Sequence, residues 1–225
     1  KEIVKACKQQ ELSIRIGVNS GSIKREFLEK YNGVNEDSMV MSALEQIRLL
    51  EELDFEDIKI SLKASNVPLT IKSYKKMSEY RNYPLHLGIT EAGPSWRGTI
   101  KSSVGIGALL AMGIGDTIRV SLTGDPVEEV KVGREILKSL GLLEEGLEII
   151  SCPTCGRTRI NLVEIVKEAE ERLKGVTGHI KVAIMGCPVN GPGEAKEADI
   201  GIAGGNGKGL IFIKGKVIRE VEEED

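Results

Sequence analysis

The sequence has no long hydrophobic run and no excess of basic residues. No apolar stretch approaches the roughly 20 residues that a membrane-spanning helix needs, and the opening residues KEIVKACKQQ do not resemble a signal peptide. The formal net charge is -3 and the isoelectric point is about 5.7, so the chain lacks the basic footprint of nucleic-acid or anionic-membrane binding. These absences argue against a membrane protein and against a nucleic-acid-binding protein.

Cysteine is also scarce. Four cysteines in 225 residues are too few for a disulfide scaffold. Most of them fall in two short stretches rich in proline and glycine, ISCPTCGR and MGCPVNGPGEA. Such close spacing favours a metal or redox site in a reducing compartment. We therefore expect a cytoplasmic protein.

The first part of the chain alternates between strand-like and helix-like segments. Strands are expected at residues 13–18, 58–62, 85–89 and 117–122. Helical periodicity is found at residues 37–53, 70–82, 98–112 and 127–140. This alternation predicts parallel βα units, arranged either as a doubly wound sheet or as a barrel.

Polar residues at the strand ends favour the barrel, because the C-terminal ends of barrel strands converge on the face where active sites form. Strand alternation places three polar sets each on one side of its strand: Arg15, Gly17 and Asn19; Lys59, Ser61 and Lys63; Arg119, Ser121 and Thr123. A purely structural interior would be apolar on this side, so we predict a cationic barrel mouth. Glu91 has the opposite parity and is expected in a loop just past its strand.

Two further polar residues are assigned structural roles. His86 lies in the middle of a predicted strand, and we interpret it as a barrel-interior histidine with satisfied hydrogen bonds rather than as an acid–base group. Cys7 lies on the predicted N-terminal helix, where a free cysteine usually behaves as a small buried hydrophobe.

The number of βα units is half of what a closed barrel needs, since such a barrel has eight. A half barrel would leave unpaired sheet edges, and the chain begins without methionine in a helix-like segment. We therefore expect residues 1–142 to form the second half of a TIM (β/α)8 barrel whose first half is missing from this sequence. Residues 143–225 are expected to form a small α/β domain with one helix at 161–174 and strands at 179–185, 199–203, 209–213 and 216–221.

The cysteine stretches lie in this second domain. A CxxC turn places two thiolates on one metal site, and the glycines around Cys152, Cys155 and Cys187 let backbone N–H groups approach the sulfurs. Glu194 is a candidate fourth ligand of another chemical kind, which would leave one iron open to a substrate. The alternative is a structural zinc site, although three cysteines and a carboxylate are less usual there. The residues alone favour an iron–sulfur cluster and leave zinc open.

Longer motifs resemble a known family. ISCPTCGR and MGCPVNGPGEA closely resemble the cluster domain of the 4-hydroxy-3-methylbut-2-enyl diphosphate synthase family, iron–sulfur enzymes of the non-mevalonate isoprenoid pathway. RIGVNSGS, ISLKAS, LGITEAGP and IRVSLTGDP resemble the later strands of its TIM barrel, so the resemblance spans essentially the whole chain. It implies an oxidoreductase that opens 2-C-methyl-D-erythritol 2,4-cyclodiphosphate with two electrons, expels a hydroxyl as water and yields the linear allylic diphosphate.

The resemblance also implies roles for individual residues. Four residues match the ligands of a 4Fe–4S cluster, the last of them displaceable: Cys152, Cys155, Cys187 and Glu194. Five match the diphosphate-binding set: Arg15, Asn19, Lys63, Arg119 and Ser121. Asn190 matches a residue near the cluster-bound substrate oxygen. Glu91 matches an acid near the reacting end, where it could donate a proton to the departing hydroxyl; an ion pair with Lys63 or Arg119 is an equal alternative.

Partners follow from the same resemblance. Family members receive electrons from a ferredoxin or a flavodoxin and pair head to tail, so a homodimer would join one subunit's barrel mouth to the other's cluster domain. The family's earlier strands supply further arginines that this sequence lacks, so we expect the chain alone to be an incomplete catalyst. The contrasting hypothesis is a non-catalytic, zinc-stabilised α/β interaction module.

Overall fold

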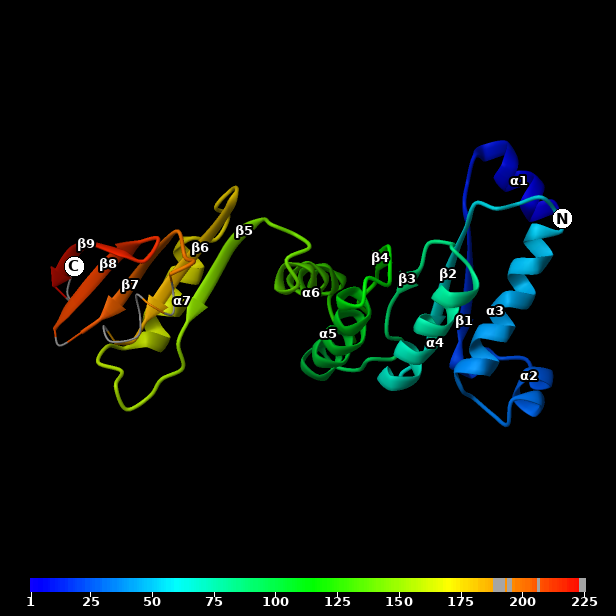
Figure 1. Ribbon diagram of the computed structural model, residues 1–225, viewed down its shortest axis with the longest axis horizontal. Helices are drawn as coiled ribbons and strands as arrows, with labels where there is room; N and C mark the ends of the chain where they lie inside the picture. The colour runs from blue at the N-terminus through cyan, green and yellow to red at the C-terminus, as the bar shows by residue number, and fades with distance from the viewer. Residues whose placement is uncertain (188–192, 194–195, 206, 223–225) are drawn as a thin grey trace. The chain divides into compact units, whose positions relative to one another are not determined.

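The computed structural model describes residues 1–187, 193, 196–205 and 207–222. The predicted site residues Asn190 and Glu194 lie outside this set. The chain divides into two compact units, Lys1–Leu143 and Glu144–Asp225. Figure 1 shows both units along the chain.

Unit 1 follows the alternating order that the sequence predicts (Figure 1). Its helices are α1 (Glu2–Gln10), α2 (Arg25–Lys30), α3 (Glu36–Glu51), α4 (Val67–Tyr80), α5 (Ser95–Ala111) and α6 (Pro126–Ser139), with a short 3-10 helix η1 (Ser20–Ser22). Its strands are β1 (Ile14–Asn19), β2 (Ile58–Lys63), β3 (His86–Leu87) and β4 (Thr117–Ile118). Helix α2 and η1 were not predicted, and β3 and β4 are shorter than the sequence suggests.

The strands of unit 1 form two parallel pairs. Strand β1 pairs with β2 along its whole length, and β3 pairs with β4 over its two residues. A single bridge between Ile60 and Leu85 joins the two pairs. The neighbour order is therefore β1, β2, β3, β4, as expected for consecutive βα units.

One hydrophobic core lies between the strands and the helices of unit 1. Its fully buried members come chiefly from β2, α3 and α4: Ile58, Ile60, Leu62, Met39, Ala43, Ile47, Tyr74 and Met77. The α3 members recur at the spacing of one helix face. The β2 members alternate with Lys59, Ser61 and Lys63, so the opposite side of the strands is free to carry polar side chains.

Side-chain caps fix where several βα loops end. The Asn35 side chain accepts a hydrogen bond from the Ser38 backbone N–H at 3.0 Å, and the Ser38 hydroxyl accepts one from the Asn35 N–H at 3.0 Å. This reciprocal capping box starts α3. Asn66 caps α4 and Asp125 caps α6, each by accepting a backbone N–H. The caps hold the polar loops that precede these helices in defined conformations.

The described part of unit 2 contains a five-stranded sheet and the helix α7 (Figure 1). Its elements are β5 (Gly146–Ser151), α7 (Leu162–Arg172), β6 (His179–Met185), β7 (Ile200–Gly204), β8 (Lys208–Ile213) and β9 (Lys216–Glu222). The strands lie in sequence order; β5, β6 and β7 are parallel, and β8 and β9 are antiparallel to their neighbours. The helix and four of the strands were predicted, whereas β5 was not.

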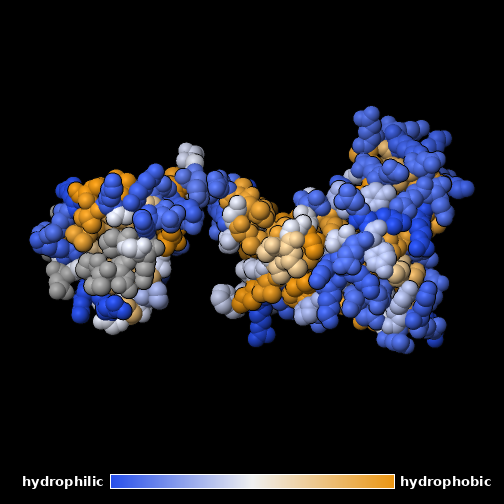
Figure 2. Space-filling view, viewed as in Figure 1, coloured by the Kyte–Doolittle hydropathy of each residue, from blue (hydrophilic) through white to orange (hydrophobic). Residues whose placement is uncertain are grey.

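The outer helices of unit 1 expose apolar side chains. Trp96, Ile100 and Val104 recur at four-residue spacing on α5, and Val127 and Val130 lie on α6; all five are exposed. Figure 2 shows apolar surface over this part of unit 1.

Within the part of the chain that is described, no helix is long and apolar enough to cross a membrane.

Candidate active site

Polar side chains share one face of the unit 1 strands. The register of β1 and β2 sets Arg15 beside Lys59 and Asn19 beside Lys63. An alanine Cβ at Gly88 would lie 3.4 Å from Lys63 Cε and 2.8 Å from the Arg119 carbonyl oxygen, so Gly88 lies between those two residues. Arg15, Asn19 and Lys63 therefore share a face, as strand alternation predicts.

Three cations of this face lie close enough to repel one another. Burial first, and then the charges of Arg119 and Arg15, lower the pKa of Lys63 to about 8. Among the described residues, no carboxylate forms an ion pair with Arg15, Lys63 or Arg119. A concentration of positive charge without counter-ions suits an anionic ligand.

Gly88 provides the space that this cluster needs. We expect Gly88→Ala to push the Arg119 carbonyl and the Lys63 side chain apart, because its Cβ would meet a backbone oxygen at 2.8 Å. The free energy of unfolding should fall by about 1–3 kcal/mol, measured by urea denaturation. Gly17→Ala is the matched control, since it lies on the same face with nothing within 4 Å of the added Cβ. Equal stability of the two variants would contradict this packing.

Tyr74 separates β2 from β3 at this face. The Ile60 N–H donates directly to the Pro84 carbonyl at 2.8 Å. Two residues further along β2, the Leu62 N–H donates instead to the Tyr74 hydroxyl at 2.9 Å, and that hydroxyl donates to the His86 carbonyl. The phenol thus occupies the place of the next ladder hydrogen bond, and its burial raises the pKa of Tyr74 to about 12. The insertion explains why only one bridge joins the two strand pairs.

His86 does not have the fully satisfied hydrogen bonds that the sequence suggested. Its Nδ1 lies 2.7 Å from the Thr117 hydroxyl, but its Nε2 is buried and has no partner among the described residues. Burial, and then the charges of Lys63, Arg15 and Arg119, lower the pKa of His86 to about 4. The prediction failed because it assumed a closed interior, whereas the neighbours of this ring are cations that cannot accept its hydrogen bond.

The low pKa of His86 predicts a pH-dependent stability. Its ordinary value is 6.5 and its folded value is about 4, so between these values the unfolded chain binds a proton that the folded chain does not. Stability should therefore fall as the pH drops from about 6.5 to about 4, by about 1–2 kcal/mol after allowance for the ring's partial exposure. Urea denaturation of the wild type and of His86→Gln across this window measures the effect. Identical pH slopes in the two proteins would contradict the assignment.

Glu91 and Ser121 lie in the loops beyond these strands. Glu91 is exposed in the segment between β3 and α5 with a left-handed backbone, φ 52, which agrees with its expected place past the strand. In the described structure it forms no ion pair with Lys63 or Arg119. Ser121 is partly buried between β4 and α6.

In unit 2, two predicted ligands lie at one edge of the sheet. Cys152 follows β5 and Cys187 closely follows β6, and these strands are parallel neighbours. The Gly186 N–H donates to Cys152 Sγ at 3.2 Å. A backbone N–H aimed at a sulfur stabilises a thiolate and is a usual feature of metal–thiolate sites.

Thr158, which the sequence reading did not single out, closes the CxxC loop. Its hydroxyl accepts the Cys155 N–H at 3.0 Å, and its own N–H donates to the Cys155 carbonyl at 3.0 Å. An added Cβ at Gly186 would lie 2.9 Å from the Thr158 methyl group, so the loop rests directly on that glycine. Hydrogen bonds from the Arg157 backbone, and then from Thr158, lower the pKa of Cys155, which favours the thiolate that a metal requires.

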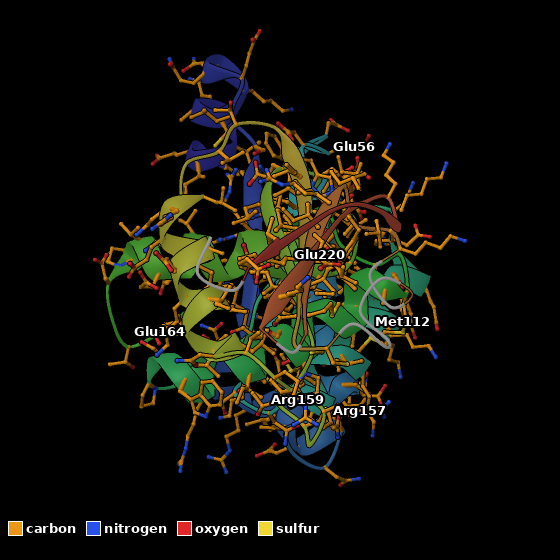
Figure 3. The ribbon with its side chains drawn as sticks, turned by 90° about the vertical axis from the view of Figure 1, so that its left-hand side faces the viewer. Glu56, Met112, Arg157, Arg159, Glu164 and Glu220 are labelled. Atoms are coloured by element: carbon orange, nitrogen blue, oxygen red, sulfur yellow. The ribbon has the colours of Figure 1, made fainter. Side chains whose placement is uncertain are left out.

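The donor set of these loops fits a thiolate-bound group. No three His, Cys, Asp or Glu side chains of the described chain are gathered closely enough to hold a metal ion, so the predicted convergence of Cys152, Cys155 and Cys187 is not seen there. Thiolates repel one another, and a bound cation supplies the attraction that gathers them. Arg157 and Arg159 project from the same loop at one end of the unit (Figure 3).

Comparison with known proteins covers both units. Residues 1–134 match the family model described as the GcpE TIM-barrel domain, and residues 148–225 match the GcpE protein C-terminal domain.

Individual relatives are similar along the whole chain. They include three proteins named 4-hydroxy-3-methylbut-2-en-1-yl diphosphate synthase (flavodoxin). The protein from Clostridium perfringens is 66% identical over 99% of this chain. Those from Caldanaerobacter subterraneus subsp. tengcongensis and Geobacter sulfurreducens are 62% and 57% identical over 100% of it. The chain spans 63–64% of the length of these relatives. With both family models matched in order along its length, this chain belongs to the GcpE family.

Proposed function

We propose that this chain acts in isoprenoid biosynthesis, in the reductive ring opening and dehydration of 2-C-methyl-D-erythritol 2,4-cyclodiphosphate to 4-hydroxy-3-methylbut-2-enyl diphosphate. The observation that carries the proposal is the cluster of Arg15, Lys63 and Arg119 without carboxylate partners in the described structure. Relatives named for this synthase support it.

The cationic face would bind the diphosphate. A cyclic diphosphate carries about two negative charges, which Arg15 and Arg119 can contact in planar bidentate fashion while Lys63 acts as a point charge. Asn19 and Ser121 would donate neutral hydrogen bonds to the remaining phosphate oxygens. Binding would also relieve the mutual repulsion that lowers the pKa of Lys63.

A 4Fe–4S cluster would be held by Cys152, Cys155, Cys187 and Glu194. When bound, the cluster supplies the electrons for the ring opening. The Gly186 N–H beside Cys152 and the Thr158 turn around Cys155 support thiolate ligands at two of these positions. Glu194, an oxygen ligand, is the one expected to yield its place to substrate.

Two polar residues would act on the reacting end of the substrate. Glu91, exposed in its loop, is proposed to donate a proton to the departing hydroxyl so that it leaves as water. Asn190 is proposed to hydrogen-bond the substrate oxygen near the cluster. Because the cations and the cysteines belong to different units, we further propose a head-to-tail homodimer that brings one subunit's cations to the other's cluster.

The electron donor is proposed to be a flavodoxin, since the names of the relatives include it; a ferredoxin is the alternative. A reducing compartment, the cytoplasm, would keep the cysteines available as ligands. The zinc-stabilised interaction module accounts for the cysteines but gives no role to the cluster of unpaired cations.

The substrate class is tested by calorimetric titration of the chain with the cyclic diphosphate. We expect saturable binding that weakens as salt rises, because it depends on charge. The parent polyol 2-C-methyl-D-erythritol, which lacks the phosphates, is the control and should not bind measurably. Equal binding of both compounds, or binding of neither, would overturn the proposed substrate.

A further inference from the structure

Few buried polar side-chain atoms of the described chain lack a hydrogen-bond partner. They are Ser61 Oγ, His86 Nε2 and Ser102 Oγ. The first two belong to neighbouring strands: the bridge between Ile60 and Leu85 places the next residues, Ser61 and His86, beside each other. Both side chains lie on the polar face. Each precedes its neighbour on that face, Lys63 or Gly88, by two residues along the strand.

The surroundings of this pair leave both atoms free to bind. The Tyr74 hydroxyl is engaged between Leu62 and His86. Ser61 lies close enough to that hydroxyl to lower the pKa of Tyr74, but its Oγ has no hydrogen-bond partner of ordinary geometry among the described residues. The Thr117 hydroxyl occupies only the Nδ1 side of the His86 ring. A buried polar atom without a partner destabilises the fold, so two adjacent ones indicate a place where a ligand supplies the partner.

The charges around the pair identify the ligand. The groups facing His86 are Lys63, Arg15, Arg119 and Lys59, all cations, and the described chain places no carboxylate in an ion pair with the first three. A ligand here must therefore be anionic. If the Thr117 hydroxyl donates to Nδ1, Nε2 carries the ring proton, and the serine hydroxyl and the imidazole are both neutral donors. Neutral donors can bind a phosphate oxygen without adding to the repulsion among the cations.

We propose that Ser61 and His86 form a polar floor beneath Lys63 that donates hydrogen bonds to the phosphate end of the bound anion. This inference rests on the proposed function and adds two ligand-binding residues to it. Tyr74 supports the floor, because its hydroxyl holds β2 and β3 apart at the level of both side chains.

The test is titration of the full chain with inorganic pyrophosphate, followed by calorimetry. Ser61→Ala and His86→Asn each remove one donor, and we expect each to weaken binding about tenfold, as for a hydrogen bond to a charged group. The matched control is Ser102→Ala, which removes a hydroxyl that is equally buried and unpartnered but lies on α5; it should bind like the wild type. His86→Gln keeps an amide N–H near the Nε2 position, so it should recover part of the affinity that His86→Asn loses.

Several results would overturn the proposal. One is wild-type affinity in folded Ser61→Ala and His86→Asn; another is an equal loss in Ser102→Ala; a third is no pyrophosphate binding by the wild type. Circular dichroism and urea denaturation establish folding, and if His86→Asn does not fold, Ser61→Ala decides alone. Iron and sulfide content is measured on the same preparations. If Ser61 and His86 do not contribute to binding but the cluster is intact, this proposal fails while the proposed function stands.

Discussion

The Cys152→Ser variant is expected to lose its bound iron and sulfide after anaerobic reconstitution, together with visible absorbance. Iron of a cluster prefers soft thiolate ligands, and a serine oxygen replaces them poorly. Cys152 is the sulfur that accepts the Gly186 N–H at 3.2 Å, so the substitution replaces the predicted soft ligand at this position with a harder oxygen. Metal and sulfide analysis of the purified variant measures the loss.

Cys7→Ser provides the matched control for this substitution. Cys7 lies on α1 and packs against the core of unit 1, away from the predicted ligand loops in sequence. Its replacement should leave the iron content unchanged. Retention of iron by Cys152→Ser, or an equal loss in Cys7→Ser, would contradict the ligand assignment.

The Lys63→Met variant is expected to bind the cyclic diphosphate about 10- to 100-fold more weakly, the cost of losing a hydrogen bond to a charged group. Lys63 lies between Arg15 and Arg119, so it contributes charge at the centre of the cluster. Lys131→Met is the control, because Lys131 lies on α6 and pairs with Glu128 at 2.6 Å. Equal affinities of the two variants would contradict a central role for Lys63.

The pKa of Lys63 adds a pH dependence to this prediction. Because the pKa is about 8, the side chain loses its proton as the pH rises through that value, and anion affinity should fall between about pH 7 and pH 9. Lys63→Arg should remove this fall, since a guanidinium stays protonated throughout the range. Because both proteins bind the same ligand, the ionisation of the ligand changes the two affinities equally, and any difference between the two titrations comes from residue 63.

The sequence was sufficient for the features that depend on local periodicity. Strand alternation along Arg15–Asn19 and Ile58–Lys63 predicted the shared polar face, and the structure bears this out through a continuous register. The family motifs likewise indicated the barrel family, which the family model over residues 1–134 confirms.

Other features depend on contacts between elements that local patterns do not encode. The Tyr74 hydroxyl replaces a ladder hydrogen bond between Leu62 and His86, and no periodicity distinguishes this tyrosine from an aromatic residue that only fills a helix–sheet core. Its insertion shortens the pairing of β2 with β3. The Thr158 turn was overlooked for the same reason: its role appears only when the CxxC loop rests on Gly186.

We expect this chain both to hold an iron–sulfur cluster and to bind a diphosphate. Iron, zinc and acid-labile sulfide per chain, measured after anaerobic reconstitution, test the first of these expectations most directly. We expect iron and sulfide in equal amounts, about four of each for a 4Fe–4S cluster. About one zinc per chain with no sulfide, as in a structural zinc site, would contradict it.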